Sequence, residues 1–157
     1  MILLAIDPGT KRKHSDGTAR AGIALFDGDK LAACWLFASP DIAGLATAIG
    51  LQAPVDLVVV EVPKVYPRSP ADPEDLILLA FTAGLLAGSA RAADLKMVRP
   101  AAWKGQRPKD VDTALTLATL TDAERETVGR CTYDIPKGLR HNVIDAIGIG
   151  LWQLGRR

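Results

Sequence analysis

Residues 57–60 are one leucine and three valines, preceded by Asp56 and followed by Glu61. A short, uninterrupted run of leucine and β-branched side chains is typical of a strand that is buried on both faces. Such strands occur where helices cover both sides of a mixed or parallel sheet. We therefore expect a central strand at residues 56–60, ended by Glu61, within a three-layer fold.

The remaining elements are read from apolar runs, turn residues and capping residues. Strands are predicted at residues 2–6, 21–26, 31–37, 56–60 and 95–98, and helices at 42–49, 73–93, 110–120, a shorter stretch after Thr121-Asp122, and 139–154. The turn at residues 27–30, Asp-Gly-Asp-Lys, joins the second and third strands as an antiparallel hairpin. Three antiparallel strands followed by alternating helices and parallel strands predict an α/β fold of the RNase H type, with a mixed five-stranded sheet between helices.

Composition limits the domain organisation and the cellular setting. The chain has 157 residues, of which 48% are hydrophobic, so we expect one domain over residues 1–157. Cys34 and Cys131 form no C-x-x-C motif, and the first residues, MILLAI, lack the basic region of a secretory signal. No apolar run reaches the roughly 20 residues of a membrane span. These features predict a cytoplasmic protein.

Three acidic residues stand where the predicted fold can bring them together. Asp7 ends the first strand, Glu61 ends the fourth, and Asp145 lies in the last helix between apolar residues. If the first and fourth strands are neighbours, their terminal carboxylates converge, and a helix packed across that edge adds the third. Carboxylate oxygens are the ligands that Mg²⁺ requires, with Mn²⁺ as an alternative. Two such ions can activate water and stabilise the leaving oxygen of a phosphodiester.

Over nearly its whole length, the chain resembles RuvC-type Holliday junction resolvases, especially their phage-like branch. The matching stretches are AIDPGT at 5–10, GIALFDGDKL at 22–31, VVVEVPKVYP at 58–67, VRPAAWKGQRPK at 98–109 and HNVIDAIGIGLW at 141–152. The resemblance implies that Asp7, Glu61 and Asp145 are catalytic metal ligands. It also implies that Lys104 and Lys109 lie near the scissile phosphate.

One position departs from that family's pattern. Many members carry an acid, and some a histidine, three residues before the final aspartate, where this chain has Asn142. His141 stands four residues before Asp145, and positions i−3 and i−4 share a helix face with residue i. Either His141 or Asn142 is therefore a candidate fourth ligand. An imidazole is the better metal ligand or proton shuttle, whereas Asn142 offers only a neutral oxygen.

The residues expected to hold DNA are basic. From Lys96 to Lys109 the chain has five cations and no acid, which is the pattern of a surface that binds phosphates without reading sequence. The DNA-contacting candidates are Lys11, Arg12, Lys13, Arg99, Lys104, Arg107, Lys109 and Arg140. Tyr66, in a proline-flanked loop after Glu61, is a candidate for stacking on an opened base step.

The helix at 73–93 is apolar nearly all round, so two surfaces must cover it. Ala80, Gly84 and Gly88 recur every four residues, which allows another backbone to come close. Either the helix packs tightly on its own sheet, or it is shared with a second subunit. A two-fold dimer would provide two active sites for the two equivalent strands of a four-way junction.

The sequence thus predicts a Mg²⁺-dependent endonuclease that resolves Holliday junctions and other branched DNA. A YqgF-like RNase H-fold nuclease acting on ribosomal RNA precursors is an alternative, although that family usually lacks the P-x-x-W-K loop found at residues 100–104. A junction-binding protein without cleavage is the other alternative, for which Asn142 is the argument.

Overall fold

A five-stranded mixed sheet forms the centre of the protein. The computed structural model describes residues 1–9, 19–39, 41–50, 54–64 and 72–157. The strands are β1 (Ile2–Pro8), β2 (Ala19–Asp27), β3 (Lys30–Ser39), β4 (Leu57–Glu61) and β5 (Asp94–Val98). Their spatial order is β3-β2-β1-β4-β5, with β1, β2 and β3 antiparallel and with β4 and β5 parallel to β1. The predicted α/β fold class and its mixed sheet are confirmed.

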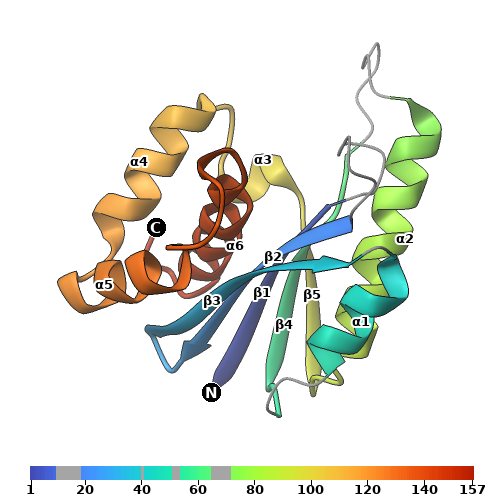
Figure 1. Cartoon of the computed structure of the whole chain (residues 1–157), viewed down its shortest axis with the longest axis horizontal. Helices are drawn as coiled ribbons and strands as arrows, with labels where there is room; N and C mark the ends of the chain where they lie inside the picture. Colours follow the sequence, from blue (N-terminus) through green and yellow to red (C-terminus); the bar gives the residue numbers. More distant parts are fainter. Residues whose placement is uncertain (10–18, 40, 51–53, 65–71) are drawn as a thin grey trace.

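Helices cover both faces of this sheet (Figure 1). The helices are α1 (Ile42–Gly50), α2 (Pro73–Ser89), α3 (Pro100–Trp103), α4 (Lys109–Thr119), α5 (Asp122–Cys131), the 3₁₀ turn η2 (Lys137–Leu139) and α6 (Arg140–Gln153). Helices α1 and α2 lie on one face, and α4, α5 and α6 lie on the other. None of the described helices is long and apolar enough to cross a membrane.

Each face of the sheet has its own apolar core, which explains the uninterrupted apolar runs. Along β1, Leu3 points into the core under α6, while Leu4 points into the core under α1 and α2. The same alternation places Val59 on the α6 side and Val58 on the other, and all four side chains are fully buried. A central strand with two covered faces has no position for a solvated side chain until it ends.

Two sequence predictions need correction. The helix expected at 73–93 ends at Ser89, because Ala90 caps it and Arg91 takes a left-handed backbone with φ of 51° before β5 begins. The segment after Pro100, expected as a basic loop, contains the short helix α3, which proline begins at its first turn.

The orientation of α2 separates the two interpretations of its small residues. The helix packs on the sheet through Thr82, Ala83, Leu86 and Ala87. Ala80, Gly84 and Gly88 are exposed, and a Cβ added at either glycine would meet nothing within 4 Å. The small residues therefore do not serve packing on the chain's own sheet.

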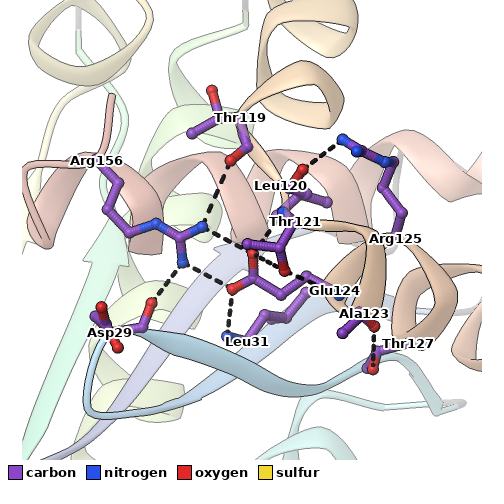
Figure 2. A network of polar contacts seen from close by, with 10 residues as sticks. All are labelled: Asp29, Leu31, Thr119, Leu120, Thr121, Ala123, Glu124, Arg125, Thr127 and Arg156. Atoms are coloured by element: carbon purple, nitrogen blue, oxygen red, sulfur yellow. Dashed lines mark hydrogen bonds and ion pairs between the residues drawn. The ribbon is translucent and has the colours of Figure 1, made fainter.

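A buried carboxylate fastens α5 to the hairpin and to the segment after α6 (Figure 2). Glu124, 4% exposed, accepts two hydrogen bonds of 2.7 Å from the guanidinium of Arg156 and one of 2.8 Å from the backbone N–H of Leu31. Its other oxygen accepts from the backbone N–H of Thr121, completing a capping box. These contacts, with that of Arg156 the largest, lower the pKa of Glu124 to about 2.

This network predicts an acid-dependent loss of stability. The lowering of the Glu124 pKa from 4.5 to about 2 corresponds to about 3 kcal/mol of stabilisation, which is fully present above pH 4.5 and lost as the pH falls through 2. We expect Glu124→Gln to reduce the free energy of unfolding at pH 7 and to flatten its dependence on pH between 4.5 and 2. Urea unfolding across this range measures both effects. The exposed Glu126, changed to glutamine, is the control, and equal curves for the two variants would contradict the assignment.

Candidate active site

Two acidic side chains leave adjacent parallel strands at the same edge of the sheet. In the β1–β4 pairing, Ile6 lies opposite Val60, so the residues that follow them, Asp7 and Glu61, emerge side by side. The carboxyl ends of parallel strands are where open α/β sheets place their ligands. The predicted convergence of these two acids is therefore a direct result of the strand order.

Helix α6 brings the third acid to this edge. Gly22 of β2 pairs with Asp7, and a Cβ at Gly22 would lie 1.9 Å from the backbone oxygen of Asn142. Only glycine lets the first turn of α6 come this close to β2. One turn further along α6 is Asp145, whose side chain is 14% exposed.

The expected residues line a single hollow of about 450 Å³. Its walls are Asp7, Pro8, Gly9, Glu61, Leu79, Lys109, Gly138, Leu139, His141, Asn142 and Asp145. All the predicted metal-ligand candidates are thus found together, contributed by β1, β4 and α6. Leu79, which reaches the hollow from α2, was not among the residues expected at this site.

The hollow concentrates negative charge. Burial, followed by repulsion from Glu61 and then Asp145, raises the pKa of Asp7 well above its usual value. Burial also raises the pKa of Asp145, and the nearby Lys104 and Lys109 partly offset this rise. Carboxylates that repel one another in a desolvated place favour a bound proton or a cation.

Two neighbouring residues already engage these acids. The Nζ of Lys104 lies 3.8 Å from Oδ2 of Asp145. The indole Nε1–H of Trp103 donates a hydrogen bond of 2.6 Å to Oε2 of Glu61. Trp103 is buried at 2% exposure, and sequence reasoning missed its contact with Glu61 because no local pattern pairs residues this far apart.

Both candidates for the fourth ligand face the hollow. Burial, and then the charge of Lys109, lowers the pKa of His141, so its imidazole is neutral at pH 7. A neutral imidazole is the form that binds metals or accepts a proton. The choice between His141 and Asn142 stays open.

The donor set suits a hard divalent cation, although the side chains do not form a closed ligand cage. Within the described residues, no three His, Cys, Asp or Glu side chains are close enough together to hold a metal by themselves. Three carboxylates nevertheless line one hollow, and burial together with repulsion from Glu61 and Asp145 raises the pKa of Asp7. Oxygen ligands and excess negative charge are what Mg²⁺ or Mn²⁺ requires.

The basic candidates divide into two groups. Lys109 lines the hollow, and Arg99 is exposed. Arg107 and Arg140 are engaged within the chain: Arg107 binds Asp112 and the carbonyl of Trp103, and Arg140 donates to the carbonyls of Ile135 and Tyr133. Lys11, Arg12, Lys13 and Tyr66 lie outside the described residues.

Comparison with solved structures finds the same fold in RuvC of Thermus thermophilus. T. thermophilus RuvC in complex with a Holliday junction substrate superposes with a TM-score of 0.57 at 16% identity, covering 96% of this chain and 90% of that chain. A second T. thermophilus RuvC structure gives a TM-score of 0.55 at 13% identity, covering 99% and 97% of the two chains. No family model and no curated protein matches this sequence. The chain therefore has a RuvC-like, RNase H-like fold.

The charge repulsion in the hollow predicts a stabilising substitution. In EDTA at pH 7, Asp7→Asn is expected to raise the melting temperature by a few degrees, because it removes a half-buried negative charge beside Glu61 and Asp145. The gain should shrink as the pH falls toward 3.8, where Asp7 becomes protonated even in the unfolded chain. Thermal unfolding of the wild type, Asp7→Asn and the exposed control Asp110→Asn measures this. A destabilised Asp7→Asn protein would show that Asp7 serves the fold instead.

Proposed function

We propose that this protein is a metal-dependent endonuclease that hydrolyses DNA phosphodiesters at four-way junctions and other branched structures. The observation that supports it most is the set of three carboxylates from β1, β4 and α6 around one hollow, with Lys104 and Lys109 beside them. The RuvC-like fold agrees with this activity.

In this proposal Asp7, Glu61 and Asp145 hold two Mg²⁺ ions, or Mn²⁺ in their place, with His141 or Asn142 as the further ligand. When bound, such ions supply an activated water and stabilise charge on the phosphate. Within the chain, the neutral imidazole of His141 is available to accept a proton at the edge of the hollow.

The two lysines have distinct roles. Lys109 is exposed and lines the hollow, so its ammonium is placed to bind a phosphate of the DNA backbone. Lys104 pairs with Asp145 and is placed to stabilise negative charge that develops at the scissile phosphate. Arg99, Arg107 and Arg140, with Lys11, Arg12, Lys13 and Tyr66, would extend the DNA surface.

A junction-binding protein without cleavage is the second candidate. Two observations favour it: Asn142 replaces the usual acid or histidine, and the described acids do not form a ready-made ligand cage. Binding alone would need the basic surface and not the carboxylates.

Cleavage of a labelled synthetic four-way junction separates these candidates. With Mg²⁺ we expect paired, symmetric nicks near the branch point, lost in EDTA and reduced at least about 100-fold in Asp145→Asn, because one ligand is neutralised. A linear duplex and a folded RNA of the same sequence are the substrate controls. Tight binding of the junction without cutting in Mg²⁺ or Mn²⁺ would establish the binding protein, and preferential cutting of the RNA would establish the ribonuclease.

We also propose that the protein acts as a homodimer, with α2 at the interface. Ile77, Phe81 and Leu85 recur once per turn on its outer side and are 70%, 63% and 37% exposed. On the side of the sheet that α2 covers, Leu95 and Met97 of β5 share the face of Val58 and Val60 but are 49% and 67% exposed. Apolar side chains gathered on one helix and one edge strand are typical of an interface.

A charge placed on this surface tests the dimer. We expect Phe81→Asp to convert a dimer into a monomer of 16.7 kDa without loss of helix content. Val111→Asp is the matched control, because Val111 is an exposed apolar residue of a helix on the opposite face of the sheet. Light scattering after gel filtration gives the mass. A wild type that is monomeric at high micromolar concentration would contradict the proposal.

A further inference from the structure

Trp103 is the residue through which α3 contacts the candidate active site. Its indole Nε1–H donates to Oε2 of Glu61 at 2.6 Å, and its side chain is buried at 2% exposure. The hydrogen bond joins two elements that are separated by α2 and β5 in the sequence. Because a carboxylate with a fixed donor loses rotational freedom, this contact restricts the orientation of the Glu61 side chain.

The same aromatic ring lies close to two cations. The Nζ of Lys104 is 4.7 Å from the ring centroid, and the guanidinium carbon of Arg157 is 5.4 Å from it. Lys104 is also the residue that pairs with Asp145. The consecutive residues Trp103 and Lys104, which we call the Trp103–Lys104 turn, therefore contact Glu61 and Asp145 respectively. A shift of this turn would change both contacts at once.

A buried ionic cluster lies behind this turn. Asp112, only 2% exposed, forms a close ion pair with Arg157 and accepts a hydrogen bond of 3.0 Å from Nε of Arg107. Arg107 donates in addition to the backbone carbonyl of Trp103 at 3.1 Å. The cluster thus contacts Trp103 both at its ring and at its backbone.

Gly148 of α6 leaves the space that this packing needs. A Cβ at that position would lie 2.6 Å from Nη1 of Arg157 and 2.7 Å from Cζ3 of Trp103. Helix α6 also carries Asp145. The ionic cluster therefore packs both against the helix that carries Asp145 and against Trp103, which contacts Glu61.

Burying such a cluster carries a large desolvation penalty. The Arg157 side chain is 3% exposed, and its Nε and Nη1 find no hydrogen-bond partner within the described residues. Apolar side chains of similar volume are often as stable as a buried ion pair, so the pair is better explained by the geometry it imposes than by its contribution to stability.

We propose that Trp103 is a positioning residue for Glu61, and that the Asp112–Arg157 pair holds Trp103 in place. The role assigned to Glu61 rests on the proposed nuclease function, but the positioning itself does not. It is therefore testable without any cleavage assay.

Nuclear magnetic resonance of the indole N–H groups provides this test. The chain has three tryptophans and hence three indole signals, of which Trp103→Phe identifies one. We expect the Trp103 signal to exchange with solvent at least about ten-fold more slowly than the signal of Trp152, since its proton is buried on a carboxylate. Glu61→Gln and Asp112→Asn should each shift this signal and speed its exchange, and Gly148→Ala, which crowds the ring, serves if Asp112→Asn does not fold.

Activity adds a second readout. Trp103→Phe keeps an aromatic ring, although a smaller one, and removes the donor, so we expect kcat for junction cleavage to fall about 10- to 100-fold while the Kd for the junction stays unchanged. Trp152→Phe, which removes an indole outside the hollow, is the matched control. If the wild type does not cut junctions, the nuclease proposal fails while the NMR result still decides the positioning. A Trp103 signal that Glu61→Gln leaves unmoved, or that exchanges as fast as that of Trp152, would overturn the inference.

Discussion

The parallel pairing of β1 with β4 is the constraint on which the candidate site depends. It makes two strands end at one edge of the sheet, so that Asp7 and Glu61 emerge side by side. Burial and mutual repulsion then raise the pKa of Asp7, an arrangement that costs folding energy unless a cation or proton balances it. A stable fold does not require carboxylates that repel one another, and this is the physical reason to assign these acids a function.

The other elements bring partners to this pair of acids. Gly22 lets α6 approach β2 closely enough for Asp145 to face the hollow. After β5, Trp103 contacts Glu61 and Lys104 contacts Asp145. The buried ion pair of Asp112 and Arg157 lies next to this turn. The site is therefore built from both sheet and helices.

The apolar runs and turn residues were sufficient to predict the mixed five-stranded sheet and most of the helices, because these follow from local periodicity. The meeting of Asp7, Glu61 and Asp145 was expected on the condition that the first and fourth strands are neighbours, which the structure shows. The end of α2 was missed because Arg91 adopts a left-handed backbone conformation, which is uncommon for residues other than glycine. The hydrogen bond from Trp103 to Glu61 and the ion pair of Asp112 with Arg157 were not predictable, since these partners are 42 and 45 residues apart in the sequence. The fourth ligand is undecided for a related reason: His141 and Asn142 both reach the hollow.

The central claim is that these carboxylates form a divalent-cation site. Anomalous diffraction from crystals grown with Mn²⁺ tests it most directly, since the signal locates the metal whether or not the protein cuts DNA. We predict anomalous density between Asp7, Glu61 and Asp145, in contact with either His141 or Asn142, and absent from Asp7→Asn crystals grown under the same conditions. Wild-type crystals with no metal in the hollow at millimolar Mn²⁺ would contradict the account.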